Sequence, residues 1–117
     1  MRNGDKGAAM INFDRIRQAA AGQLGSDQQQ LVTQGLDILD TLLRKNHDYG
    51  GSAWKSPILA PGLNPREAIQ CRMSDKVERL SKLLSGGQPL VAESINDTMR
   101  DLAGYAILWL GCPNDTI

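Results

Sequence analysis

The chain contains few of the residues that bind transition metals or cross-link small secreted domains. Its 117 residues include a single histidine, His47, and two cysteines, Cys71 and Cys112, without the paired spacing of a zinc site. We therefore expect no zinc centre and two free thiols, which is the usual state in a reducing cytoplasm.

The sequence also lacks an excess of either charge and any long apolar run. Lysine plus arginine and aspartate plus glutamate are both 13, so the formal net charge is zero. No general attraction to nucleic acid or anionic lipid is expected. No segment approaches the roughly 18 apolar residues of a membrane span. Residues 1–10 are polar, and we expect them to form a flexible leader. We thus predict a cytoplasmic protein without membrane or direct nucleic-acid binding.

Strand-like alternation is absent too, and apolar residues instead recur at helical spacing. We expect a short helix at about 11–21, followed by longer ones at about 26–46, 65–85 and 90–110. Asn64 followed by Pro65 is a typical helix start, and Gly86 with Gly87 is a typical end. The prediction is an all-α, four-helix-bundle-like fold in a single domain over residues 11–112.

A long segment without periodicity, residues 47–64, separates the second and third predicted helices. Loops of this length are uncommon in small domains and tend to be functional or mobile. Tyr49 or Trp54 in this loop is a candidate for stacking on a nucleotide base. Trp54 is equally expected to cover the hydrophobic core. We expect the loop, with Lys45 and Asp48 at its start, to close over a ligand.

Three acidic residues, Glu93, Asp97 and Asp101, are four residues apart in the last predicted helix, so their carboxylates should share one face. They point away from the strongest apolar stripe, which favours a solvated acidic face. However, residues 103–110 are apolar nearly all round, which indicates burial on several sides and a homo-oligomer, a dimer or larger. On that view the acidic face looks into a loop, a pocket or a second subunit. Carboxylates there favour Mg²⁺ or Mn²⁺.

The preceding helix offers the complementary charge. Arg72, Lys76 and Arg79 have i, i+4, i+7 spacing and share one face, and Asp75 lies beside them. These bases either pair with neighbouring acids on the bundle surface or bind phosphate. Acids for a metal and bases for phosphate on adjacent helices together indicate a nucleotide.

The order of these motifs resembles the phage and prophage family called nucleotide modification associated domain 1, over about residues 40–110. The resemblance rests on Lys45-Asn46-His47-Asp48-Tyr49-Gly50, Ser52-Ala53-Trp54, residues 75–80 and residues 93–105. It implies nucleotide chemistry without defining a reaction. The acid-rich helices are also similar to the all-α MazG-like pyrophosphatases, in which acids hold Mg²⁺ around a triphosphate. This chain lacks their E-x-x-E motif, and Asp37-Ile38-Leu39-Asp40 is the nearest match.

The first hypothesis is an enzyme that hydrolyses or modifies a nucleotide with Mg²⁺. Its metal ligands would be Glu93, Asp97 and Asp101, and its catalytic carboxylates Asp75, Glu93 and Asp97. Ligand binding would use the bases and the loop: Lys45, Asp48, Tyr49, Trp54, Arg72, Lys76 and Arg79.

Two alternatives stay open. One is a non-catalytic binder that sequesters a nucleotide or a cyclic nucleotide signal of host defence; a phage-encoded chain would act in the host cytoplasm. The other is a structural bundle that binds another protein.

Overall fold

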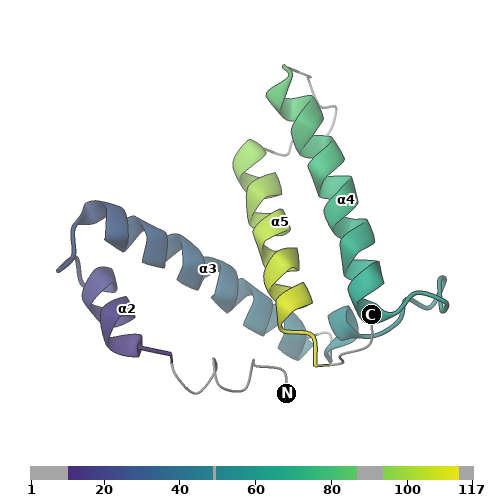
Figure 1. The fold of residues 1–117 in the computed structure, drawn as a ribbon, viewed down its shortest axis with the longest axis horizontal. Helices are drawn as coiled ribbons and strands as arrows, with labels where there is room; N and C mark the ends of the chain where they lie inside the picture. Colours follow the sequence, from purple (N-terminus) through teal and green to yellow (C-terminus); the bar gives the residue numbers. More distant parts are fainter. Residues whose placement is uncertain (1–10, 49, 87–93, 114–117) are drawn as a thin grey trace. The chain divides into compact units, whose positions relative to one another are not determined.

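The computed structural model describes residues 11–48, 50–86 and 94–113, and helices are the only regular secondary structure in these ranges (Figure 1). The α-helices are α2 (Phe13–Ala20), α3 (Ser26–Asp48), α4 (Pro65–Leu84) and α5 (Ile95–Leu110), and a short 3₁₀ helix, η1 (Ser52–Trp54), lies in the long loop. The predicted all-α class is confirmed, with one short helix followed by three longer ones. None of these described helices is long and apolar enough to span a bilayer.

The chain forms two compact units, Met1–Asp37 and Ile38–Ile117, whose boundary falls within α3. In the first unit, Asn12 caps α2 by accepting a hydrogen bond from the backbone N–H of Asp14 (3.0 Å). The Gln29 side chain donates to the carbonyl of Ala20 (3.2 Å) and so ties α3 to the end of α2. The predicted leader, residues 1–10, lies outside the described residues, and the single domain over residues 11–112 stays a prediction.

In the second unit, α4 begins where the sequence predicted. The Asn64 side chain accepts from the backbone N–H of Glu67 (2.9 Å), and the Glu67 carboxylate accepts from the backbone N–H of Asn64 (3.0 Å). This capping box satisfies two donors that a helix start would leave without partners. The helix ends at Leu84, before Gly86, whose φ of +88° favours glycine.

Two side chains hold the C-terminal end of α5 against the rest of this unit, and we call Arg66 and Trp54 the α5 clamp. The Arg66 guanidinium is buried and donates to the carbonyls of Trp109 (3.1 Å) and Cys112 (3.2 Å). It also lies 5.1 Å from the centre of the Trp109 ring. The Trp54 indole donates to the carbonyl of Leu108 (2.9 Å). The clamp therefore satisfies carbonyls that a helix end leaves without partners, and its cation meets the negative end of the helix dipole.

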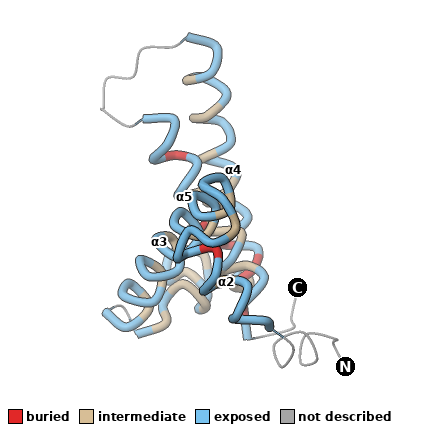
Figure 2. Tube along the Cα trace, turned by 90° about the vertical axis from the view of Figure 1, so that its left-hand side faces the viewer, coloured by how far each residue is buried: buried red, intermediate tan, exposed pale blue. Residues whose placement is uncertain are grey.

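Helices α4 and α5 pack side by side and antiparallel (Figure 1). Their contact buries few residues, of which Ile69 and Thr98 are the largest that are fully enclosed. Figure 2 shows the buried positions as short red segments on helices that are otherwise exposed (pale blue) or intermediate (tan). The second half of α3 also approaches α5, because a Cβ added at Gly104 would lie 3.4 Å from the Leu42 side chain.

The structure corrects two expectations for α5. The helix begins at Ile95, with Ser94 as its N-cap, and not near Leu90. Its apolar stripe is also only partly buried: Ile95 and Met99 are exposed and Leu102 and Ala106 are half-buried, whereas Thr98 and Gly104 are buried. Small residues allow helices to approach closely, which explains why this face and not the aliphatic one packs inward.

We predict that Arg66→Ala lowers the free energy of unfolding by about 2–4 kcal/mol, because it removes the side-chain donor to the Cys112 carbonyl and one of two donors to the Trp109 carbonyl, and removes packing over Trp109. Urea denaturation measures this change. The matched control is Arg44→Ala, which removes an exposed ion pair with Asp40 and should cost at most about 0.5 kcal/mol. Equal effects of the two substitutions would contradict the role of the α5 clamp.

Candidate functional site

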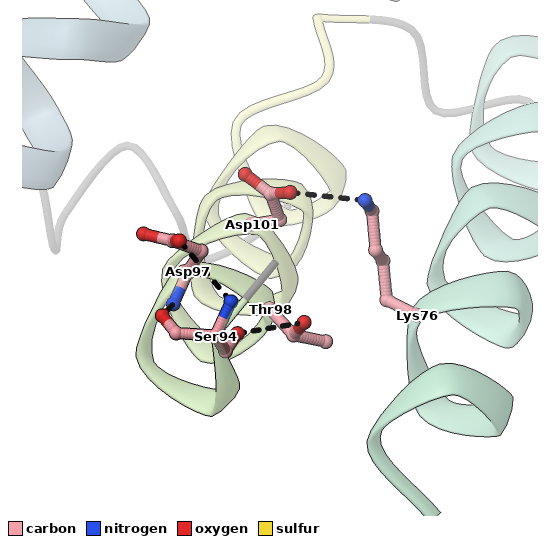
Figure 3. A network of polar contacts seen from close by, with 5 residues as sticks. All are labelled: Lys76, Ser94, Asp97, Thr98 and Asp101. Atoms are coloured by element: carbon pink, nitrogen blue, oxygen red, sulfur yellow. Dashed lines mark hydrogen bonds and ion pairs between the residues drawn. The ribbon is translucent and has the colours of Figure 1, made fainter. Parts of the chain in front are cut away.

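The charged rows of α4 and α5 meet at one ion pair. The Lys76 ammonium lies 3.0 Å from a carboxylate oxygen of Asp101 (Figure 3). The two side chains are 24% and 43% exposed, so the pair is partly shielded and still open to solvent. Water and small ions can reach this pair, and it is held more firmly than a fully exposed one.

Lys76 is the middle residue of three bases on α4, which we call the cationic row: Arg72, Lys76 and Arg79. All three are half-buried, whereas the adjacent Asp75 and Val77 are exposed. Since the spacing puts the row on one helical face and Lys76 contacts α5, that face of α4 is the one turned toward α5. The structure therefore places the row beside the acidic residues of α5.

Asp97 lies one turn before Asp101 and belongs to the capping box of α5. Its backbone N–H donates to the Ser94 hydroxyl (3.0 Å), and its carboxylate accepts from the Ser94 backbone N–H (3.3 Å). The hydrogen bonds with Ser94, and to a smaller degree the nearby charge of Arg100 at 3.7 Å, lower the pKa of Asp97 below its ordinary value. Asp97 is therefore fully ionised at neutral pH.

The predicted metal ligands are only partly described. Glu93 lies outside the described residues, so the triad of Glu93, Asp97 and Asp101 stays a prediction. Within the described ranges, no three histidine, cysteine, aspartate or glutamate side chains form a metal-binding group. Magnesium binding by Asp97 and Asp101 stays a prediction; proteins usually bind Mg²⁺ through one or two carboxylates while phosphate oxygens and water complete the shell.

The structure describes three of the four residues predicted to close over a ligand: Lys45, Asp48 and Trp54. Lys45 and Asp48 are exposed on the last turn of α3, and Asp48 lies 3.5 Å from the His47 ring. Trp54 donates to the carbonyl of Leu108 as part of the α5 clamp, and the expectation that it covers the hydrophobic core stays a prediction. Tyr49 lies outside the described residues. The described geometry thus gives Trp54 a structural contact and leaves the closing role of the loop a prediction.

Two important residues were missed from the sequence. Ser94 caps α5, and its signal was available, because serine followed three residues later by an acidic residue is a typical helix start. Arg66 gave no comparable signal, since its partners, Trp109 and Cys112, lie more than 40 residues further along the chain.

The fold and this site define an all-helical protein in which a cationic row and an acidic helix face each other. A comparison with family models matches residues 45–110 to Nucleotide modification associated domain 1. Since the match covers more than half of the chain, the chain belongs to this family. No curated protein and no solved structure matches the chain. All the predicted site residues fall within the matched segment, and the similarity to MazG-like enzymes stays a prediction.

We predict that Ser94→Ala raises the pKa of Asp97 toward the ordinary aspartate value, because the largest cause of the lowered pKa is removed. Because the pKa of Asp97 is lower in the folded than in the unfolded chain, the ionised group stabilises the folded chain at pH values above the unfolded pKa of about 4. This stabilisation is lost as the pH falls below about 4 and through the folded pKa. An NMR titration of the Asp97 carboxyl group measures the midpoint. Ser74→Ala on α4 is the control, and a midpoint that neither variant moves would contradict the assignment.

A double-mutant cycle with Lys76→Met and Asp101→Asn should give a coupling of about 1 kcal/mol in the free energy of unfolding, the upper end for pairs open to solvent. The comparison pair is Lys82 with Glu78, which is more exposed and 3.6 Å apart. If the coupling of Lys76 with Asp101 is no larger than that of this pair, partial burial does not strengthen it.

Proposed function

We propose that the facing charges of α4 and α5 bind the phosphates of a nucleotide, and that the protein hydrolyses or modifies this nucleotide with Mg²⁺. The observation that supports the proposal is the Lys76–Asp101 ion pair, in which an ammonium group and a carboxylate from two helices lie 3.0 Å apart. Membership of a nucleotide modification associated family agrees with a nucleotide ligand.

The cationic row provides two kinds of phosphate donor. The guanidinium groups of Arg72 and Arg79 suit bidentate contacts with phosphate oxygens, and Lys76 acts as a point charge between them. These side chains are half-buried, so part of the entropic cost of ordering them is already met in the folded chain. A phosphate bound here would compete with Asp101 for Lys76.

Asp97 and Asp101 are the described carboxylates that would hold Mg²⁺. The ion would neutralise phosphate charge and favour a nucleophilic water. Both carboxylates are ionised at neutral pH, as aspartates ordinarily are, and a metal ligand must be ionised. Asp75 and Glu93 are the further candidates for a catalytic carboxylate, beside Asp97.

A second candidate function is binding without turnover. The contacts that these acids make within the chain favour it, since Asp101 forms an ion pair with Lys76 and the Asp97 carboxylate accepts a hydrogen bond from Ser94. Acids in such roles position bases and need no metal. The chain would then sequester a nucleotide or a cyclic nucleotide signal.

The proposal predicts that nucleotides raise the thermal stability of the chain. Ligand at 100 times its Kd should stabilise by about 2.7 kcal/mol, and scanning fluorimetry with a nucleotide panel measures the shift. Arg79→Ala should remove most of the shift. Lys82→Ala, an exposed cation on the same helix, should not. No shift with any nucleotide contradicts nucleotide binding.

Product analysis with and without Mg²⁺ separates the two candidates. Turnover that needs Mg²⁺ and is lost in Asp97→Ala supports the enzyme, and Ser94→Ala controls for the lost helix cap because it keeps the carboxylate. Tight binding with the nucleotide recovered intact supports the sequestering protein. Full turnover in Asp97→Ala would exclude Asp97 as a catalytic residue.

A further inference from the structure

The loop before α4 presents two aliphatic side chains to solvent. Ile58 is 94% exposed and Leu59 is 97% exposed, and we call these two residues the tip. Isolated exposed aliphatics are common on protein surfaces. Two adjacent ones with almost no contact to their own chain are a different case, because they offer their whole apolar area to a partner.

The tip is held in a fixed conformation. The backbone N–H of Ala60 donates to the carbonyl of Pro57 (3.1 Å), and that of Leu63 donates to the carbonyl of Ala60 (3.1 Å). Pro57 and Pro61 restrict the backbone on either side of the tip. Residues 56–64 contain no charged side chain. A rigid, uncharged loop loses little conformational entropy and little solvation of charge when it is buried, which favours binding in an apolar site.

A matching apolar surface lies at the other end of the α4–α5 pair. It consists of Val77 and Leu84 on one face of α4 and Ile95 and Met99 on one face of α5, and we call it the acceptor end. Their side chains are 38 to 64% exposed. Spacings of seven and four residues put each pair of side chains on a common helical face.

The tip does not cover the acceptor end of its own chain. Val77 and Leu84 lie about 18 and 28 Å along α4 from its first residue, Pro65, at 1.5 Å per residue. Figure 1 shows the loop at the end where α4 begins and α5 ends. The same unit therefore exposes an apolar projection at one end and an apolar surface at the opposite end.

We propose that a second copy of this chain docks antiparallel to the first, with the tip of each copy packed on the acceptor end of the other. Two-fold symmetry makes both contacts at once, because each copy supplies one tip and one acceptor end. This inference does not depend on the proposed nucleotide function. It also differs from the association expected from the sequence, which used residues 103–110.

The available area agrees with a stable dimer. A fully exposed aliphatic side chain buries roughly 100 Å² of apolar surface, so the tip and the acceptor end together offer about 400 Å² per copy. Since somewhat more than half of a typical interface is apolar, the pair would bury roughly 1,300 Å² in total. Stable protein–protein interfaces begin at about 1,200 Å².

Sedimentation equilibrium over a concentration series of the full chain tests the proposal. The wild-type chain should form dimers, and the tip variant Ile58→Ser/Leu59→Ser should weaken the dimer at least a hundredfold, because four aliphatic side chains lose their burial. The tip is almost fully exposed, so the fold should be unaffected. Leu31→Ser is the matched control: Leu31 is a 69% exposed leucine on α3, outside both surfaces, and its dimer should match the wild type.

Mixing two variants tests the reciprocal contact. The acceptor variant Val77→Ser/Met99→Ser should also be monomeric by itself. A mixed dimer of tip and acceptor variants keeps one intact contact, so mixing should restore part of the association that neither variant shows alone. A monomeric wild-type chain at all concentrations, or a dimer that the tip variant leaves intact, would overturn the proposal.

Discussion

The α5 clamp sets how α4 and α5 align, and the candidate site depends on this alignment. Arg66 stands ten residues before Lys76 on α4, and Trp109 stands eight residues after Asp101 on α5. At 1.5 Å per residue these separations are about 15 and 12 Å. The Arg66–Trp109 contact and the Lys76–Asp101 ion pair are therefore two compatible contacts of the same antiparallel pair. The hydrogen bond from Trp54 to the carbonyl of Leu108 supports the first contact at the same end of α5.

The interior of the α4–α5 pair is polar for a helical protein. Fully enclosed Thr98 lies three residues before half-buried Asp101 on α5, while Met99 is exposed and Ile69 is the enclosed aliphatic residue of α4. A contact of this kind gives up some hydrophobic stabilisation. In return, charged side chains are held between two helices where a charged ligand can reach them, and aliphatic side chains are left outside for a partner. The two proposals thus follow from one choice of packing face.

The sequence predicted much of the fold because helices leave local signals. The start of α4 followed from Asn64 and Pro65, whose capping geometry the structure shows directly. The start of α5 was placed too early, because helical periodicity was extended past the Ser94 cap. The exposure of Ile95 and Met99 could not be predicted, since periodicity finds an apolar stripe and cannot tell whether it packs within the chain or against a partner.

For the site, residue spacing was enough to group the charged side chains on each helix. The structure pairs Lys76 with Asp101, which are the opposite charges expected to attract one another. The clamp role of Arg66 could not be predicted, because it joins residues far apart in the sequence. The contact of Trp54 could not be predicted either. The sequence allowed Trp54 to stack on a base or to cover the core, and its hydrogen bond to the end of α5 is known only from the structure.

A titration of the isotope-labelled chain with a nucleoside triphosphate and Mg²⁺, followed by side-chain and backbone NMR shifts, tests whether the charged faces of α4 and α5 bind phosphate. We expect the largest shifts at the cationic row and at Asp101. Shifts confined to other surfaces, or none at saturating nucleotide, would contradict phosphate binding at these faces.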